Sequence, residues 1–148
     1  MTDTARRFLL GILLLGLLGI GTELLLLAHD EDVKQLIPFV AIALAAAAIG
    51  WVWFAPGPAA IRAFQAAMVL FLLSGAAGTV LHFRANLEFQ TEVDPSIKGM
   101  ALFTKAVRAK TPPALAPGAM IQLGLLGLAY TFKHPAANRN RPGKTGTE

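Results

Sequence analysis

The chain has 148 residues, of which 55% are hydrophobic and only 15% are charged, and this composition is typical of a membrane protein. It contains no cysteine, which excludes disulfides, thiolate metal sites and cysteine nucleophiles. The net charge of +4 does not indicate a partner made of nucleic acid, because the basic residues lie at the ends of apolar runs and form no patch with aromatic residues.

Four apolar runs follow one another along the chain, at residues about 8–29, 36–54, 59–83 and 115–132. Each comes close to the roughly 20 residues that cross about 30 Å of hydrocarbon. The runs lack the alternation of barrel strands, and lipid requires internal bonding of every backbone polar group, so all four are predicted to be helices. The sequence therefore predicts an all-α integral membrane protein, with a four-helix transmembrane bundle in residues 1–134.

The first run follows Arg6 and Arg7 and resembles the start of a signal peptide. However, its apolar core is longer than a signal-peptide core, Glu23 interrupts it, and no small-x-small cleavage site follows it. We therefore expect this run to remain as the first membrane span.

The distribution of lysine and arginine predicts the orientation of the spans. One side of the membrane holds Lys34 in a short loop and a longer loop of mixed charge. The other side holds seven basic residues in its short flanking segments, and we expect it to be the cytoplasmic side. Both termini would then lie in the cytoplasm. We expect the membrane to be the inner membrane of a bacterium. The basic residues of the cytoplasmic side are Arg6, Arg7, Arg62, Lys133, Arg139, Arg141 and Lys144.

The third connection, residues 84–113, is the longest polar segment, and it is predicted to contain a short interfacial helix at about 95–109. Asp94 is a candidate N-cap, and Pro95 suits the first helical position. The helix could pack on its own protein, lie on the membrane surface or dock a partner. Its apolar stripe consists of Ile97, Met100, Phe103 and Val107. The tail, residues 135–148, is predicted to be flexible, basic and cytoplasmic.

Small residues recur at helical spacing in every run and predict faces for close helix packing within the chain, with a protein partner or in a homo-oligomer. In three of the four runs the face also carries a polar side chain. The predicted faces are Gly16, Gly19 and Glu23; Ala43, Ala47 and Gly50; Gly75, Gly78 and His82; and Gly118, Gln122 and Ala129.

Glu23 is the one charged residue of the first run, and it lies near the outer end of the predicted helix. The same depth is predicted for Gln122, Thr79 and His82, with Asp30 just above on the face of Glu23. A carboxylate in the membrane is costly to insert, so we expect Glu23 to face the bundle and to be hydrogen-bonded to Gln122 or His82. The inner half of the bundle is predicted to be nearly free of polar residues.

Two interpretations of this outer cluster remain open: a structural polar knot, or a carboxylate that binds a proton or a ligand. A metal site has only weak candidates, because no HExxH or Glu-x-x-His spacing is present. These candidates are His29, Asp32, His82 and Glu88. The sequence predicts no cofactor, and only His82 lies close enough to a span to suggest a haem ligand.

No catalytic constellation is recognisable, because Ser74 and Ser96 are the only serines and no glycine-rich phosphate loop is present. The sequence thus favours a binding or structural role over an enzyme. The leading hypothesis is an accessory subunit or modulator of a larger membrane complex. The alternative is a small transporter or a proton- or cation-coupled binding protein, in which Glu23 is the ion site. In that alternative Gln122 and Thr79 line the pathway, and His82 and Asp30 form the outer gate.

Overall fold

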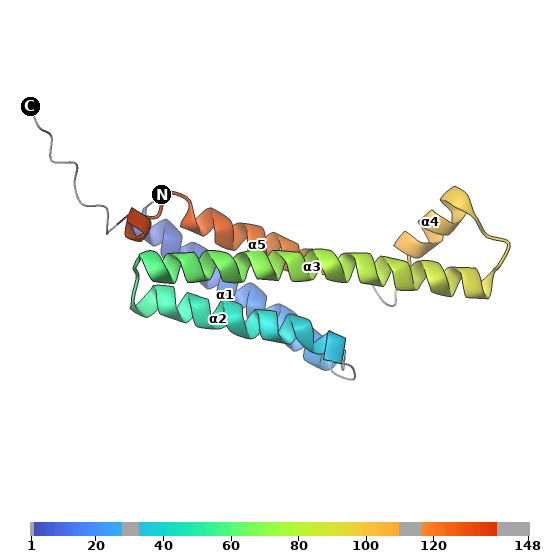
Figure 1. Ribbon diagram of the computed structural model, residues 1–148, viewed down its shortest axis with the longest axis horizontal. Helices are drawn as coiled ribbons and strands as arrows, with labels where there is room; N and C mark the ends of the chain where they lie inside the picture. Colours follow the sequence, from blue (N-terminus) through green and yellow to red (C-terminus); the bar gives the residue numbers. More distant parts are fainter. Residues whose placement is uncertain (1, 28–32, 110–116, 139–148) are drawn as a thin grey trace, which may run out of the picture.

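The computed structural model describes residues 2–27, 33–109 and 117–138, and in these ranges the chain is helical and contains no strand. Figure 1 shows the long helices running along one another, with a shorter helix against them and a small helix near one extremity. The α-helices are α1 (Asp3–Leu26), α2 (Ile37–Phe54), α3 (Pro58–Val93), α4 (Gly99–Val107) and α5 (Gly118–Thr131). Two 3-10 helices, η1 (Val33–Leu36) and η2 (Pro135–Asn138), complete the described structure.

The helices pack in a definite order around a shared apolar core. α1 packs against α2 and α5, and α3 packs against α2, α5 and α4. The start of α1 and η2 lie at one end of the molecule, whereas α4 lies at the other end (Figure 1). The core joins leucines of α1, small residues of α2 and the aromatic residues Phe64 and Phe71 of α3, both of which are fully buried.

Among the described residues, three helices are long and apolar enough to cross a membrane: α1, α2 and α3. They match the first three predicted spans, so the prediction of an all-helical protein with apolar spans is confirmed for these three. α5 has 14 residues and, at 1.5 Å per residue, is about 21 Å long, which is shorter than the hydrocarbon layer of about 30 Å. The fourth span and the four-helix transmembrane bundle therefore remain predictions.

The third helix is longer than predicted. α3 has 36 residues and continues to Val93, although its apolar run ends at Phe83. Asp94 was predicted to cap the following helix, but it is the C-cap of α3, and its carboxylate accepts hydrogen bonds from the Ser96 hydroxyl at 2.6 Å and the Ser96 N–H at 3.1 Å. These bonds lower the pKa of the Asp94 carboxyl. The short helix begins at Gly99, later than predicted, where a φ of 60° suits glycine.

Glycines bring α3 and α5 into close contact. A Cβ added at Gly75 would lie 2.8 Å from the carbonyl oxygen of Pro117, and one at Gly124 would lie 3.0 Å from the carbonyl oxygen of Met68. The predicted small face of the third helix is confirmed at Gly75 and Gly78, both of which meet Pro117 or its neighbours. In α5, by contrast, the close contacts are made by Gly124 and Gly127 and not by Gly118.

The predicted small face of the second helix is wrong. Ala43 and Ala47 are exposed, and no neighbouring atom lies within 4 Å of a Cβ built on Gly50. The face of α2 that packs into the core is shifted around the helix and contains Ala41, Ala45, Ala48, Ile49 and Val52. α2 is apolar all round, so its sequence did not indicate which face turns inward.

Candidate functional site

Among the described residues, Glu23 and Gln122, which were predicted to meet near the outer end of the bundle, are not hydrogen-bonded to each other. Glu23 is exposed near the end of α1, and Gln122 is exposed near the start of α5. No hydrogen bond between described residues joins Glu23 to Gln122 or to His82, so the predicted bond is not formed. Helix α1 does not pack against α3, which carries His82, and although α1 does pack against α5, the side chains of Glu23 and Gln122 are both exposed.

The other members of the predicted cluster make local contacts or lie outside the described residues. The hydroxyl of Thr79 donates to the carbonyl of Gly75, one turn earlier in the same helix, at 3.0 Å. His82 is half-buried, and Glu88 is exposed on α3. Asp30, His29 and Asp32 lie outside the described residues. Within the described ranges, no group of three or more His, Asp or Glu side chains is placed to hold a metal ion.

A buried polar cluster does exist, but at the opposite end of the molecule, which was predicted to be nearly bare. We call it the terminal cluster, and its centre is Arg6, which is only 5% exposed. The Arg6 guanidinium donates to the carbonyls of Tyr130 at 2.7 Å, Lys133 at 3.1 Å and Phe132 at 3.4 Å. The members of the terminal cluster are Arg6, Gln65, Tyr130, Thr131 and His134.

Arg6 of α1, which is far from α5 along the chain but packs against it, therefore caps the C-terminal end of α5. The final carbonyls of an α-helix have no partner within the helix, and a cation near that end also interacts favourably with the helix dipole. Arg6 supplies both the hydrogen bonds and the charge. This contact binds the first turns of α1 to the end of α5.

His134 is the second anchor of the terminal cluster. Its Nδ1 accepts a hydrogen bond from the backbone N–H of Ala136 at 3.2 Å, and its Nε2 lies 3.1 Å from the hydroxyl of Tyr130. A backbone N–H can only donate, so in the neutral ring Nδ1 is the acceptor and Nε2 carries the hydrogen. Burial lowers the pKa of the His134 imidazole, and the positive charge of Arg6 lowers it further.

Two further contacts tie α3 into the terminal cluster. The amide of Gln65 donates to the hydroxyl of Thr131 at 3.1 Å, and that hydroxyl in turn donates to the carbonyl of Leu128 at 2.8 Å. The ring of Phe64 meets the ring of Tyr130 edge-on, with centroids 5.4 Å apart. Three helices, α1, α3 and α5, thus converge on one polar centre. No helical spacing marks this centre in the sequence, because α5 ends at Thr131 and Lys133 has a φ of 47°, so Tyr130 and His134 do not share a helix.

A second distinctive feature is the end of the molecule that carries α4. We define the distal arm as residues 84–107, which comprise the extension of α3, the turn after it and α4. Asn86 is fully buried between the two helices, and its amide donates to the carbonyl of Ala106 at 3.3 Å. The rings of Phe83 and Phe103 meet edge-on, with centroids 5.6 Å apart.

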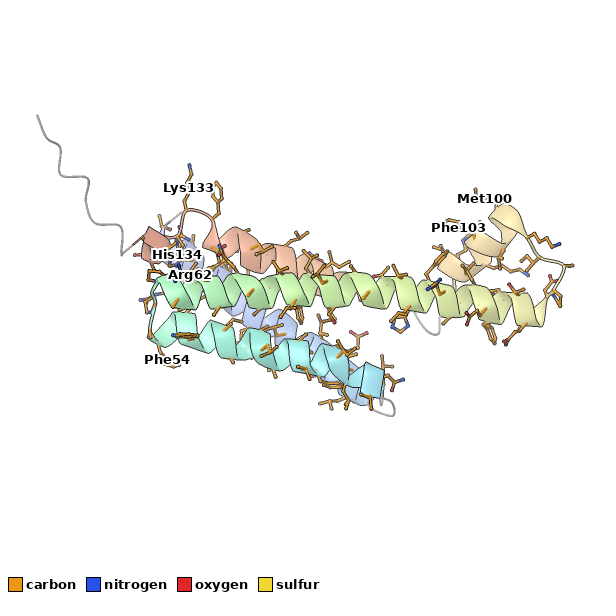
Figure 2. All side chains as sticks on the ribbon, in the orientation of Figure 1. Phe54, Arg62, Met100, Phe103, Lys133 and His134 are labelled. Carbon is orange, nitrogen blue, oxygen red and sulfur yellow. The ribbon has the colours of Figure 1, made fainter. Side chains whose placement is uncertain are left out.

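Large apolar side chains remain exposed on the distal arm. The exposed fractions are 54% for Phe89, 65% for Val93, 75% for Met100 and 51% for Phe103. Met100 and Phe103 lie on α4 near one extremity of the molecule, far from Lys133 and His134 (Figure 2). The predicted stripe of the short helix is therefore only partly covered, because Ile97 is buried whereas Met100 and Phe103 are not.

We expect Asn86→Ala to loosen α4 from α3. The substitution removes the donor to the buried Ala106 carbonyl, and an unsatisfied buried group costs about 1–3 kcal/mol. Hydrogen–deuterium exchange of residues 99–107 should therefore accelerate by about five- to a hundredfold. Thr91→Ala, an exposed position on the same helix, is the control and should leave the exchange unchanged. Equal protection of α4 in native and Asn86→Ala protein would show that this bond does not hold the distal arm together.

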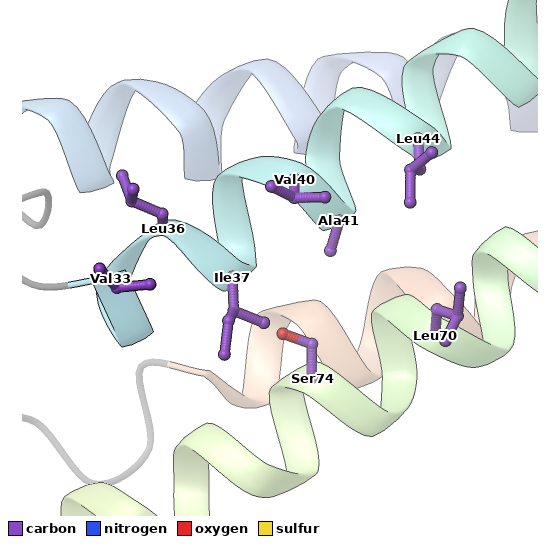
Figure 3. A pocket seen from close by; sticks show the side chains of 8 residues that line it. All are labelled: Val33, Leu36, Ile37, Val40, Ala41, Leu44, Leu70 and Ser74. Atoms are coloured by element: carbon purple, nitrogen blue, oxygen red, sulfur yellow. The ribbon is translucent and has the colours of Figure 1, made fainter.

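An apolar groove of about 470 Å³ lies between α2 and α3. Figure 3 shows the Ser74 hydroxyl of α3 pointing toward Ile37 of α2, and Ser74 is the only polar residue among the described residues of the lining. None of the described lining residues of the groove has a carboxylate, imidazole or amide side chain that could bind an ion. Its lining residues are Val33, Leu36, Ile37, Val40, Ala41, Leu44, Leu70 and Ser74.

Over the part of the chain that the structure describes, the fold defines the class as a helical protein with three helices long and apolar enough to cross a membrane. Comparisons of the chain with known protein families, with characterised proteins and with solved structures gave no match.

Proposed function

We propose that the chain is a four-span protein of a bacterial inner membrane that serves as an accessory subunit or modulator of a larger membrane complex. In this proposal the distal arm docks a partner protein outside the lipid. The terminal cluster is structural and holds the ends of the helices together on the cytoplasmic side.

The arrangement of the helices supports this orientation. The start of α1 and the end of α5 lie at the same end of the molecule, as an even number of crossings requires (Figure 1). That end carries Arg6, Arg7, Arg62 and Lys133, and positive charge favours the cytoplasmic side. Trp51 and Trp53, near the end of α2, are half-exposed, as expected for residues at a membrane interface.

The exposed apolar side chains of the distal arm carry the proposal. Residues 84–93 continue α3 past its apolar run and, at 1.5 Å per residue, extend about 15 Å further. Val93 and Met100 would therefore lie in water and not in hydrocarbon. A group of large apolar side chains that lipid does not cover is typical of an interaction surface. A partner that buries Phe89, Val93 and Met100 would remove the unfavourable exposure of these apolar side chains to water.

The transporter alternative is not supported by a specific contact. It requires Glu23 to face an internal polar pathway, but in the structure Glu23 is exposed on α1. Among the described residues, the groove between α2 and α3 is lined by apolar side chains and Ser74, and none of these is a carboxylate, imidazole or amide. The accessory role is therefore the function that we carry forward.

Purification of the tagged protein from its native membrane in mild detergent tests the proposal. We expect the native chain to elute in a complex of fixed stoichiometry. The double substitution Val93→Ser and Met100→Ser should abolish that complex, because both side chains are largely exposed, at 65% and 75%, and the substitution removes the apolar surface that the partner would bury. Phe54→Ser is the matched control: Phe54 is 85% exposed at the other end of the molecule, and its loss should leave the complex intact (Figure 2).

Two outcomes would overturn this proposal. If the native chain elutes alone under conditions that preserve other membrane complexes, the accessory role fails. If a complex persists in the double variant, then the partner does not dock on the distal arm.

A further inference from the structure

We propose that His134 and the turn it anchors form a pH-sensitive latch, which holds η2 against the bundle while the imidazole is neutral and releases it when the imidazole gains a proton. The latch is independent of the proposed function, since it rests on the hydrogen bonds of the terminal cluster alone.

The latch is closed by two hydrogen bonds to one ring. Nδ1 of His134 accepts from the N–H of Ala136, the second residue of η2, and Nε2 donates to the hydroxyl of Tyr130 in α5. The backbone N–H of Ala137 also donates to the carbonyl of His134 at 3.0 Å. Ala136 itself is 6% exposed and belongs to the apolar core, so η2 is docked on the bundle and not merely adjacent to it.

A proton can add to the neutral ring only at Nδ1, because Nε2 already carries a hydrogen. Once Nδ1 is protonated, it can no longer accept the bond from Ala136, and two donors face each other at 3.2 Å. The bond to Tyr130 can persist. Protonation therefore breaks the hydrogen bond from Ala136, which orients η2, and keeps the hydrogen bond to Tyr130, which fixes the ring.

The charged groups around His134 have opposite effects on the pKa of its imidazole. Arg6 of α1 opposes the charged imidazole, and Asp3 of the same helix favours it, with the smaller effect. Arg62 of α3 and Lys133 next to His134 add positive charge at the same end of the molecule, and Tyr130 of α5 is neutral near pH 7 (Figure 2). The imidazole is buried as well, so the surroundings as a whole favour the neutral ring.

The direction of the pH effect follows from these surroundings. Folding lowers the pKa of His134 below its usual 6.5, so between the lowered value and about 6.5 the folded chain binds fewer protons than the unfolded chain. The contribution of the latch is complete above pH 6.5. It is lost progressively as the pH falls through this window.

Hydrogen–deuterium exchange of the full chain in detergent tests the latch, with rates corrected for the intrinsic effect of pH. We expect the protection of the Ala136 and Ala137 amides to fall at least tenfold between pH 7.5 and pH 5, while the interior of α2 stays protected. His134→Gln is the control, because its amide can accept from Ala136 and donate to Tyr130 but does not titrate. This variant should keep its protection at both pH values.

An NMR titration of the native chain gives a second measurement that needs no variant. The ring nitrogens of His134 should show hydrogen on Nε2 at pH 7.5, and the Ala136 amide signal should shift with the same midpoint as the ring. The latch is ruled out if protection is equal at the two pH values, if His134→Gln loses as much protection as the native chain, or if the neutral ring carries its hydrogen on Nδ1.

Discussion

Gly124→Val is expected to lower the unfolding temperature of the detergent-solubilised protein by about 6–12 °C. This estimate combines an overpacking cost of about 3 kcal/mol with a shift of about 2–4 °C per kcal/mol in a chain of this size. The cost arises because a Cβ at this position would lie 2.9 Å from Cβ of Leu72, 3.0 Å from the carbonyl oxygen of Met68 and 3.1 Å from the Leu72 nitrogen. Backbone atoms cannot move aside as a flexible side chain can, so the two helices must separate.

Gly75→Val should have a comparable effect for the same reason, since the nearest atom is the carbonyl oxygen of Pro117 at 2.8 Å. Gly11→Val is the matched control: Gly11 lies in α1, and a Cβ built there meets no atom within 4 Å. Unfolding followed by circular dichroism gives the comparison. If Gly124→Val unfolds at the same temperature as Gly11→Val, then α3 and α5 do not approach as closely as the structure shows.

Arg6→Met should destabilise the protein by about 3 kcal/mol, because hydrogen bonds to a charged group contribute about 1.5–3 kcal/mol each and their effects overlap. The methionine keeps much of the volume but leaves three carbonyls at the end of α5 without their donor. The unfolding temperature should fall by about 6–12 °C. Amide exchange at the last turn of α5 should accelerate as well.

Arg7 supplies a strict control for this experiment, because it is the next residue along the chain, has the same charge and is exposed. Arg7→Met should change the unfolding temperature by no more than about 1–2 °C, as is usual for exposed positions. Arg6→Lys should be intermediate, because an ammonium group cannot present two nitrogens to separate carbonyls as the guanidinium does. Equal effects of Arg6→Met and Arg7→Met would show that the hydrogen bonds of Arg6 to the end of α5 add nothing to stability.

The sequence predicted the apolar parts of the fold well, because a run of about 20 apolar residues has few other stable conformations in lipid. It failed where a helix continues without its apolar signal. Polar residues such as Arg84, Asn86 and Glu88 interrupt the apolar sequence after Phe83, so hydropathy predicts a helix end there, whereas α3 continues to Val93. The edge of the membrane and the end of a helix are separate features, and hydropathy indicates only the first.

The candidate sites were harder to predict, because each depends on which helices are neighbours. Glu23 was expected to meet His82, but α1 does not pack against α3. Arg6 was interpreted only as an orientation signal, since its acceptors are backbone carbonyls more than a hundred residues away and no side-chain motif reveals them. Gly75 and Gly78 were predicted correctly, whereas Gly124 and Gly127 of α5 were missed, because the predicted face of that helix was the one with the polar Gln122 and these two glycines lie on another face.

The docking of the distal arm in a complex is the central claim, and the absence of cysteine from the chain allows a direct test. The thiol introduced by Met100→Cys can be labelled with a membrane-impermeant reagent in the purified protein and in native membranes. We predict rapid labelling of the purified protein and labelling at least tenfold slower in native membranes opened on both sides, where a partner covers this side chain. A thiol introduced by Thr2→Cys, at an exposed position of the opposite end, should react equally in both. Equal labelling at Met100 in both preparations would contradict the account.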